Sequence, residues 1–398
     1  MSMFTRKSSI LITCPREIPP YLKNEILSLG FPVRSEFIAA VETEGTLEDT
    51  MKLNLFLRTG HRVLYLLKKF RAANPDELYK KVSEITWEEY IRKDGYLSVS
   101  SSVNNPSITD TRFANRKCKD AIVDRFYKKY GQRPDSGPGR DDAVIYLYWE
   151  NDRCSIYLDT SGAPLPRRGY RKIPFKAPMQ ETLAAATIIA TGWNGEENFI
   201  NPMCGSGTLA IEAALIALNK APGLLRDNFG FMHIRGFKKD LWTDLRNGAS
   251  SEVKESIKGK IIATDIDPRA IEAARKNARM AGVGNLINFG IADYSQTFVP
   301  EGSGIVMVNP EYGERMGEIE ELKDIYRGIG DYFKKSCQGY RGYIFTGNSN
   351  LAKQVGLRTK RKIPFYNSNI ECRLLEYDLY EGSKKDKKDT VTVHVKGE

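Results

Sequence analysis

Histidine and closely spaced cysteine are scarce in this sequence. It contains three histidines, and its six cysteines are spread along the chain without any C-x-x-C pair. Metal sites and disulfide frameworks need such side chains at close and regular spacing, so neither a metal site nor a set of disulfides is predicted. We expect each thiol to occupy a small buried or half-buried apolar position instead. The cysteines are Cys14, Cys118, Cys154, Cys204, Cys337 and Cys372.

Long apolar runs are absent as well. No stretch approaches the roughly 20 apolar residues that a membrane span needs, and the first residues, MSMFTRKSSILITC, lack the apolar core of a secretory signal. We therefore expect a soluble, cytoplasmic protein with no membrane partner. A hydrophobic fraction of 41% in 398 residues fits two or three domains, each with its own core.

Positive charge is in excess. The sequence has 60 Lys and Arg against 50 Asp and Glu, which gives a formal net charge of +10. Such a balance favours a polyanionic partner, because cationic side chains release the counterions of a nucleic acid. Charge alone does not decide the matter, since many basic proteins bind no nucleic acid specifically.

The first 160 residues are predicted to form two small mixed units. In residues 1–60 a strand over SSILITCP precedes a helix over IPPYLKNEILSLG, and FIAAVETEG continues as strand. In residues 61–160 the strands YLSVSSSV, AVIYLYWE and CSIYLDTSG alternate with helices over PDELYKKVSEI and RKCKDAIVDRFYKKYG. This second unit has the pattern of an α+β domain. Residues 161–176, which include PLPRRGYRK, are expected to be a linker.

From residue 177 to about 382 the pattern changes to an alternation of strands and helices. Strands are predicted over NFINP, KIIATDID, LINFGIAD, GIVMVNP and YRGYIFTGN, and helices over the segments between most of them. This order implies right-handed crossovers and a parallel, doubly wound sheet. The charged tail, residues 383–398, is expected to be solvated, although an RNA-binding arm is an alternative.

The loop after the first of these strands is rich in glycine. It has the sequence NPMCGSGT, in which Gly205 and Gly207 allow a tight turn and Thr208 can cap the next helix. With Ala210 the stretch also fits the dinucleotide pattern G-x-G-x-x-A, so an NAD-dependent enzyme has to be weighed. That pattern requires an acidic residue about 20 positions onward, whereas the next strand ends only at Asp265, after an insertion from about 220 to 258.

Polar residues end the next two strands. Asp265 is placed to accept both hydroxyls of a ribose, and Asp293 to accept a hydrogen bond from an adenine amino group. An adenosine without a pyrophosphate suits this set, and S-adenosylmethionine is the common cofactor of that kind. The alternative is that Asp265, Asp267 and Asp293 are only caps and turn residues, but three such aspartates together with the glycine loop favour a cofactor site. The predicted cofactor residues are Asn201, Pro202, Cys204, Gly205, Gly207, Thr208, Asp265, Ile266 and Asp293.

The motifs NPMCGSGT, TDID and NPEYG, in this order, resemble those of Rossmann-fold methyltransferases that modify planar amino groups. The stretches RRGYR, APMQETLAAA and NPEYGER are similar to the THUMP-containing RNA guanine-N2 methyltransferases, and among them to the bacterial group that modifies 23S ribosomal RNA. Upstream, GTLEDTMKLNLFLRTGHRVLYLL, KDAIVDRF and YLDTSG are similar to the same family, so the resemblance covers about residues 8–380.

The resemblance implies an α/β chain with a Rossmann-like class I methyltransferase domain over residues 177–382. An α+β region precedes it, with a ferredoxin-like unit within residues 1–60 and a THUMP RNA-binding domain within residues 45–160. The implied partner is RNA, ribosomal first and transfer RNA as the alternative, and the implied product is N2-methylguanosine.

The predicted catalytic residues are Asn309, Pro310 and Tyr312 of NPEYG. The nitrogen of an exocyclic amino group is a poor nucleophile, and two acceptors on its N–H bonds would direct its lone pair at a methyl group. The Asn309 side-chain oxygen and the Pro310 carbonyl can be these acceptors, and Tyr312 can stack on the base. Glu314 and Arg315 are expected to hold the loop.

Two residues depart from the family pattern. Asn201 stands where the family usually has Asp, and Glu311 stands where it usually has a second Pro. The first removes a negative charge beside the methionine end of the cofactor, and the second adds one beside the base. A non-catalytic RNA-binding or ribosome-assembly factor therefore stays an alternative, although the intact Asn309, Pro310 and Tyr312 speak against it.

Two further segments have a structural and an RNA-binding interpretation. The basic residues of RRGYRK either form a solvated linker or contact phosphates. The aromatic residues of the insertion, which include Phe229, Phe231, Phe237 and Trp242, are expected to cover the sheet, with stacking on RNA as the alternative. The predicted RNA-binding residues are Arg167, Arg168, Arg171 and Lys172.

Overall fold

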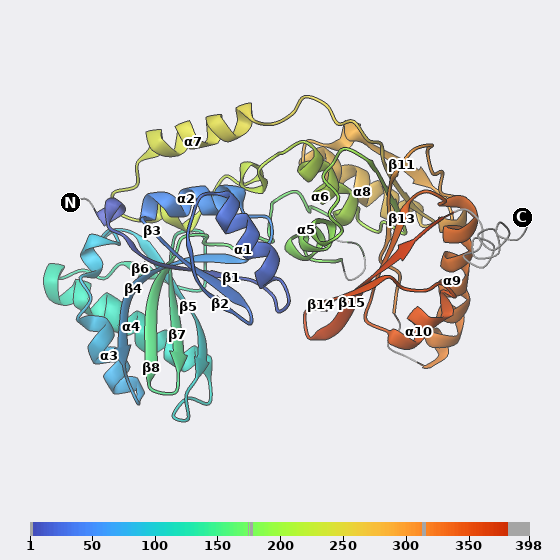
Figure 1. Cartoon of the computed structure of the whole chain (residues 1–398). Helices are drawn as coiled ribbons and strands as arrows, with labels where there is room; N and C mark the ends of the chain where they lie inside the picture. Colours follow the sequence, from blue (N-terminus) through green and yellow to red (C-terminus); the bar gives the residue numbers. More distant parts are fainter. Residues whose placement is uncertain (1–2, 174, 176–177, 313–315, 381–398) are drawn as a thin grey trace, which may run out of the picture. The chain divides into compact units, whose positions relative to one another are not determined.

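The computed structural model describes residues 3–173, 175, 178–312 and 316–380. The chain divides into two compact units, and each passes the chain to the other more than once (Figure 1). The N-terminal unit comprises Met1–Arg171, Gln180–Ala186 and Leu218–Glu255. The C-terminal unit comprises Lys172–Met179, Thr187–Ala217 and Ser256–Glu398. The charged tail and the loop residues Glu314 and Arg315 lie outside the described residues.

One eight-stranded sheet runs through the N-terminal unit, in the order β2-β3-β1-β4-β8-β7-β5-β6. Its two halves, which the sequence pattern suggests as separate units, are joined because β1 of the first pairs antiparallel with β4 of the second. The strands are β1 (Ser8–Thr13), β2 (Val33–Phe37), β3 (Ala40–Gly45), β4 (Arg62–Arg71), β5 (Tyr96–Asn104), β6 (Asp135–Ser136), β7 (Ala143–Glu150) and β8 (Arg153–Asp159).

The helices of this unit begin and end at recognisable signals. Thr46 and Asp49 form a capping box at the start of α2, Asn74 caps α3, and Gly131 ends α4 in the left-handed conformation at φ +68°. The sequence pattern predicts α1, α3 and α4 but not α2. The helices are α1 (Pro19–Ser28), α2 (Leu47–Phe56), α3 (Pro75–Ser83) and α4 (Thr111–Tyr130), with short 3-10 turns at Met3–Thr5 and Trp87–Glu89.

The insertion between the first two strands of the second half packs into the N-terminal unit. It forms 3-10 turns at Pro222–Leu225 and Gly230–His233 and helix α7 (Lys239–Ser251). Phe229, Phe231 and Trp242 are buried, and the Phe231 and Trp242 rings lie 4.9 Å apart. The Phe231 amide donates to the Thr160 carbonyl at 3.0 Å. The aromatic residues thus cover the N-terminal sheet instead of the expected one, and burial leaves these three rings no face for RNA.

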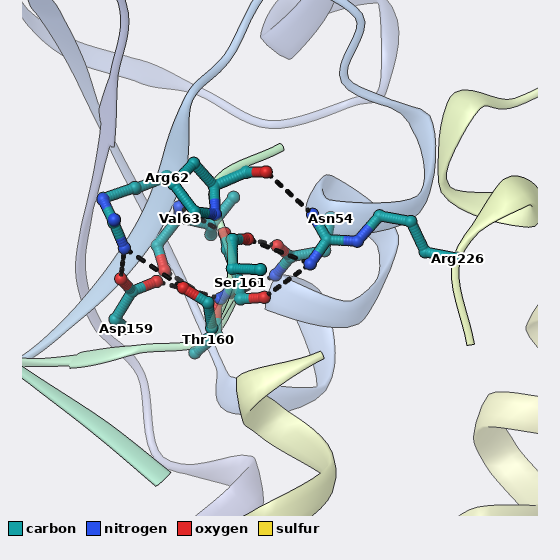
Figure 2. A network of polar contacts seen from close by, with 10 residues as sticks. Asn54, Arg62, Val63, Asp159, Thr160, Ser161 and Arg226 are labelled. Carbon is teal, nitrogen blue, oxygen red and sulfur yellow. Dashed lines mark hydrogen bonds and ion pairs between the residues drawn. The ribbon is translucent and has the colours of Figure 1, made fainter. Parts of the chain in front are cut away.

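A buried polar network fixes the insertion at the end of β8 (Figure 2). Arg226 donates to the carbonyls of Ser161 and Ala163 at 3.0 and 2.9 Å. Ser161 in turn donates to Asn54 of α2 at 2.6 Å, and Asn54 donates to Thr160 at 2.9 Å. The side chains of Asn54, Thr160, Ser161 and Arg226 are all buried, and their polar groups are paired with one another and with backbone carbonyls.

The C-terminal unit contains a seven-stranded sheet in the order β11-β10-β9-β12-β13-β15-β14. The first five strands in this order are parallel, as the alternation predicts, and β15 pairs antiparallel with both β13 and β14. The sequence analysis missed this last hairpin. The strands are β9 (Asn198–Pro202), β10 (Ile261–Asp265), β11 (Ile287–Ile291), β12 (Gly304–Val308), β13 (Arg341–Thr346), β14 (Arg361–Asn367) and β15 (Ile370–Asp378).

Helices connect the parallel strands of this unit. One core forms where Leu322, Tyr326 and Phe333 of α9 pack on Ile200 and Val306 of the sheet. Helix α6 packs on β9 and β10, and α8 packs on β10 and β11. The helices of the second half are α5 (Glu181–Ala190), α6 (Thr208–Ala217), α8 (Pro268–Met280), α9 (Met316–Ser336) and α10 (Ser349–Gln354), with 3-10 turns at Gly284–Leu286 and Tyr294–Gln296.

Some features concern the described residues as a whole. All six cysteines are unpaired and buried, as expected for apolar positions. No helix of the described segments is both long and apolar enough to cross a bilayer. Within the same residues no group of three or more His, Cys, Asp or Glu side chains could hold a metal ion.

Candidate active site

The strand order of the C-terminal sheet reverses between β9 and β12. Chain connections leave this point in opposite directions, which opens a crevice at the carboxyl ends of the two strands, where α/β proteins bind ligands. Asn201 lies near the end of β9, and Asn309 directly follows β12. The sequence-predicted cofactor and catalytic residues are therefore brought to one edge of one sheet.

The glycine loop after β9 has a strained backbone. Met203, Gly205 and Gly207 have φ values of +54°, +54° and +83°, in the left-handed region. Met203 is a residue type that rarely adopts this conformation, and such strain is concentrated at functional sites. A Cβ on Gly207 would lie 2.9 Å from the Cβ of Ala274 in α8, so this glycine is needed for the close approach of loop and helix.

Two other residues of this loop have buried side chains. Burial raises the pKa of the Cys204 thiol above its ordinary value, with a further contribution from Asp265, so the sulfur is protonated and unreactive at neutral pH. Ser206 is also buried, and its Oγ has no hydrogen-bond partner among the described residues. Thr208 is the first residue of α6 and is buried.

Asp265 at the end of β10 ties the loop to the sheet. One carboxylate oxygen accepts from the Gly205 amide at 2.9 Å, and the other accepts from the Asp267 amide at 3.0 Å. A carboxylate has about four acceptor positions, so two remain for a ligand's hydroxyl groups. The next residue, Ile266, is 70% exposed although it is apolar. The pair thus presents acceptors and an apolar surface side by side.

A neighbouring turn supplies further candidates. Asp293 caps the 3-10 turn after β11 by accepting from the Ser295 amide at 2.9 Å. Thr297 lies beside the end of β10, since its hydroxyl is 2.6 Å from that of Thr264. Phe298 follows it and is 67% exposed. The sequence analysis missed Phe298, because an aromatic residue in an irregular segment carries no periodic signal.

Asn201 is fully buried in β9, next to β12. Its Nδ2 donates to the Met307 carbonyl of β12 at 2.9 Å, a bond that the carboxylate usual in the resembling family cannot make. Its Oδ1 is shielded from solvent and has no hydrogen-bond partner among the described residues. An unpaired buried acceptor is uncommon in a folded protein and indicates a place for a donor. Pro202 completes β9 and is also buried.

Asn309, which directly follows β12, also has an unpaired side-chain oxygen. Its side chain is half-buried, and its Oδ1 is shielded from solvent without a hydrogen-bond partner in the described part of the chain. Pro310 is buried and Glu311 is exposed. The carboxyl edge therefore presents two unpaired acceptor oxygens, one from Asn201 and one from Asn309, on adjacent parallel strands.

Tyr312 is half-buried and held at both ends. Its hydroxyl accepts from Asn367 Nδ2 at 3.0 Å, and its carbonyl accepts from Asn348 Nδ2 at 3.2 Å. Burial raises the pKa of the Tyr312 phenol to about 12, so the group is neutral at physiological pH. A neutral, oriented ring is suited to packing on a planar ligand and unsuited to removing a proton.

The basic segment of residues 167–172 does not act as one surface. Arg167 and Lys172 are exposed, whereas Arg168 is only 2% exposed and donates to the Leu57, Leu165 and Arg58 carbonyls. A guanidinium so enclosed has a structural role and is not available to a phosphate. Arg171 is paired with the buried Glu181, so the phosphate-contacting interpretation now rests on Arg167 and Lys172.

Three family models match the chain. The RMKL-like methyltransferase domain model matches residues 168–376, which is just over half of the 398 residues. The THUMP domain model matches residues 72–159, and the RlmL ferredoxin-like domain model matches residues 9–64.

Curated relatives cover nearly the whole chain. It is 38% identical over 379 residues to the ribosomal RNA large subunit methyltransferase K/L of Syntrophotalea carbinolica. The alignment covers 93% of this chain and 53% of that protein. This chain is 34% identical over 369 residues to a Synechocystis protein named RNA methyltransferase slr0064. That alignment covers 92% of this chain and 96% of the Synechocystis protein. The chain thus spans about half the length of the K/L relatives and nearly all of the Synechocystis protein.

Solved structures share the fold and confirm the resemblance. The crystal structure of SMU.472, a methyltransferase complexed with SAH, matches with a TM-score of 0.86 and 27% identity over 95% of this chain and 100% of that one. A Listeria monocytogenes protein described as an N6-adenine-specific DNA methylase matches with a TM-score of 0.84 and 30% identity over 94% and 97%. This chain therefore belongs to the RMKL-like methyltransferase family, with a THUMP domain and an RlmL ferredoxin-like domain ahead of its methyltransferase domain.

Proposed function

We propose that this protein is an S-adenosylmethionine-dependent RNA methyltransferase that forms N2-methylguanosine, with 23S ribosomal RNA as its substrate. The K/L relatives are named for methylation of large-subunit ribosomal RNA, and 93% of this chain aligns with 50–53% of the first two of them. The THUMP match and the excess of basic residues support an RNA partner.

The residues at the sheet edge fit the cofactor. The related SMU.472 structure contains SAH, the demethylated form of that cofactor. Asp265 has acceptor positions left for two ribose hydroxyls, and Ile266 and Phe298 offer exposed apolar surface for a purine. The unpaired Asn201 Oδ1 can accept from an ammonium group, and the unpaired Ser206 Oγ can donate to a carboxylate. When bound, S-adenosylmethionine supplies an electrophilic methyl group.

The unpaired Asn309 Oδ1 is the observation that carries the proposal. An amino group on a purine has two N–H bonds, and its lone pair is delocalised into the ring. Asn309 Oδ1 and the Pro310 carbonyl together offer two acceptors, which would localise that lone pair and fix its direction. Positioning of this kind accelerates transfer without a strong general base.

Tyr312 supplies the surface for the base. Its ring is neutral, and its hydroxyl and carbonyl are both held by asparagines. Stacking of an extruded base on an aromatic ring contributes about 1–3 kcal/mol, which offsets part of the cost of removing the base from its stack. Catalysis is thus assigned to Asn309, Pro310 and Tyr312 acting by position and electrostatics.

The test is methyl transfer from labelled S-adenosylmethionine. The protein is incubated with unmodified 23S ribosomal RNA transcript and, separately, with unmodified transfer RNA, and the labelled nucleoside is identified after digestion. We expect N2-methylguanosine in the ribosomal transcript, and at least a hundredfold lower rate in Asn309→Ala, about the loss of one well-placed acceptor in a transition state.

Binding of SAH, measured by calorimetry, is the control. Asn309→Ala should bind SAH as the parent does, because its amide faces the acceptor nucleotide. Label in adenosine would reassign the base, and label in transfer RNA alone would reassign the substrate. SAH binding without transfer to any RNA would favour an assembly factor and refute the enzyme. Glu311→Pro, which restores the second proline of the family motif, should be at least as active as the parent.

A further inference from the structure

The β14–β15 hairpin reaches the catalytic loop. Asn367 ends β14, Ile370 begins β15, and the two residues face each other across the turn. Asn367 Nδ2 donates to the Tyr312 hydroxyl at 3.0 Å, which joins positions 55 residues apart in the sequence. The hairpin lies beyond the parallel strands, so the fold does not need its tip to complete the cofactor edge.

Asn348 holds the other end of Tyr312. It caps α10 by accepting from the Asn350 and Leu351 amides at 3.0 and 3.1 Å, and its own amide donates to Thr346 at 3.1 Å. Its Nδ2 is then left to donate to the Tyr312 carbonyl. Since Asn348 is itself held by these three hydrogen bonds at the start of α10, it gives the Tyr312 backbone a fixed partner.

The Tyr312 and Ile370 side chains both pack against the backbone of Gly347. A Cβ on this glycine would lie 3.3 Å from Tyr312 Cδ2 and 2.9 Å from Ile370 Cγ2. Both side chains therefore border the same backbone segment. The same Cβ would lie 3.4 Å from Cys372 Sγ, and Cys372 is buried in the core.

Ile370 is the outer end of an apolar row. Along β15 alternate side chains point to the same face, and on this face Leu374 and Cys372 are fully buried. Ile370 continues the row but is 42% exposed. The apolar surface of the core thus emerges at the hairpin tip, next to Tyr312.

We propose that the hairpin tip forms one wall of the acceptor-nucleotide site, with Asn367 as the positioning residue for Tyr312 and Ile370 in contact with the extruded nucleotide. The inference rests on the proposed function, because it assumes that Tyr312 stacks on the base. A ring already held by Asn367 does not have to be ordered when RNA binds, and this pre-organisation strengthens binding. Asn367 touches neither the reacting nitrogen nor the methyl group, so its effect belongs to the KM for RNA.

A double-mutant cycle tests the positioning role. Tyr312→Phe and Asn367→Ala remove the same hydrogen bond from opposite sides, and each should raise the KM for RNA about 2- to 10-fold, the value of one hydrogen bond. For Asn367→Ala we expect kcat and SAH affinity to stay near those of the parent, because Asn367 acts only through Tyr312. The double variant should be no worse than the poorer single variant, because each single variant already lacks the Asn367–Tyr312 hydrogen bond, and the contact of the Tyr312 hydroxyl with Cys372 is lost in Tyr312→Phe alone and in the double variant alike.

Ile370 has its own test with a matched control. Ile370→Ser should raise the KM for the 23S transcript about 3- to 10-fold, since the contact with one apolar side chain is lost. Met280 ends α8 and is 54% exposed, and α8 packs on β10 and β11, toward the edge of the sheet opposite the hairpin. Met280→Ser should leave KM and kcat unchanged.

Several results would overturn the inference. Unchanged kinetics in Asn367→Ala, or losses that multiply in the double variant, would make Asn367 a structural residue only. Should Asn367→Ala fail to fold, Tyr312→Phe still reports on the same bond from within the loop. A parent protein that binds SAH but methylates no RNA would refute the proposed function, and with it the hairpin's role. An active parent with normal Asn367 and Ile370 variants would refute the hairpin's role alone.

Discussion

Gly207 offers a quantitative test of how the cofactor loop is built. Its φ is +83°, and a Cβ added to it would lie 2.9 Å from the Cβ and 3.3 Å from the Cα of Ala274. Gly192, in the same unit, has a φ of +72° with no atom within 4 Å of its added Cβ. Alanine at either position meets the same backbone penalty, and only Gly207→Ala also collides with a helix.

The expected magnitudes follow from these two terms. A left-handed alanine costs about 1–2 kcal/mol, which is the whole effect for Gly192→Ala. Forcing an extra methyl group against α8 adds about 1–3 kcal/mol, because Ala274 is fully buried and its backbone cannot retreat freely. We therefore expect Gly207→Ala to lower the unfolding free energy of this unit by about 2–5 kcal/mol in total.

Gly205→Ala separates stability from ligand binding. Its φ is +54°, and its added Cβ also meets no atom within 4 Å. In the free protein it should therefore resemble Gly192→Ala. If a cofactor occupies the space in front of the loop, Gly205→Ala should also weaken SAH binding by at least tenfold, whereas Gly192→Ala should not.

Hydrogen exchange measured by mass spectrometry on peptides of β9 and β10 gives the local opening free energies, and calorimetry gives SAH affinity. The reasoning would be refuted if Gly207→Ala lost no more stability than Gly192→Ala. It would equally be refuted if Gly205→Ala bound SAH as well as the parent does.

Three further predictions concern buried charge. His61 is half-buried, and its desolvation, together with the positive charges of Arg168 and Arg62, lowers its pKa to about 4 from 6.5. Because the unfolded chain takes up a proton first, stability present above pH 6.5 should fall by about 3 kcal/mol as pH drops to 4, and urea titrations of His61→Gln should lack this loss. Arg226→Met leaves the Ser161 and other carbonyls unpaired, so proteolysis within residues 218–255 should be about 100-fold faster. Asp265→Asn, with one acceptor oxygen instead of two, should weaken SAH binding about 10- to 100-fold in calorimetry.

Much of the C-terminal unit could be predicted because its signals are local. Each parallel strand is a short apolar run followed by a polar turn, and each connecting helix has its own amphipathic or alanine-rich pattern. Asn201, Asp265, Asp293 and Asn309 were placed at strand ends from this pattern alone. Parallel strands bring their carboxyl ends to one edge, so their common location followed from topology without any contact being known.

The hairpin β14–β15 was missed for a physical reason. Arg361, Lys362 and Pro364 give β14 the composition of an exposed edge, which protects the end of a sheet from further pairing but weakens the strand pattern. The hydrogen bond from Asn367 to Tyr312 is equally invisible in the sequence, because it joins two polar residues with no shared periodicity.

The sequence by itself determined the α/β class, the order of the strands' motifs and the residues that meet at the carboxyl edge, since all of these depend on neighbours within a few positions. Only the tertiary structure decided that the insertion of residues 218–255 belongs to the N-terminal unit, that Arg168 is buried, and that Asn201 and Asn309 each retain an unpaired oxygen. These features depend on contacts between distant segments, where the free energy of burying a polar group is settled by partners that no local pattern specifies.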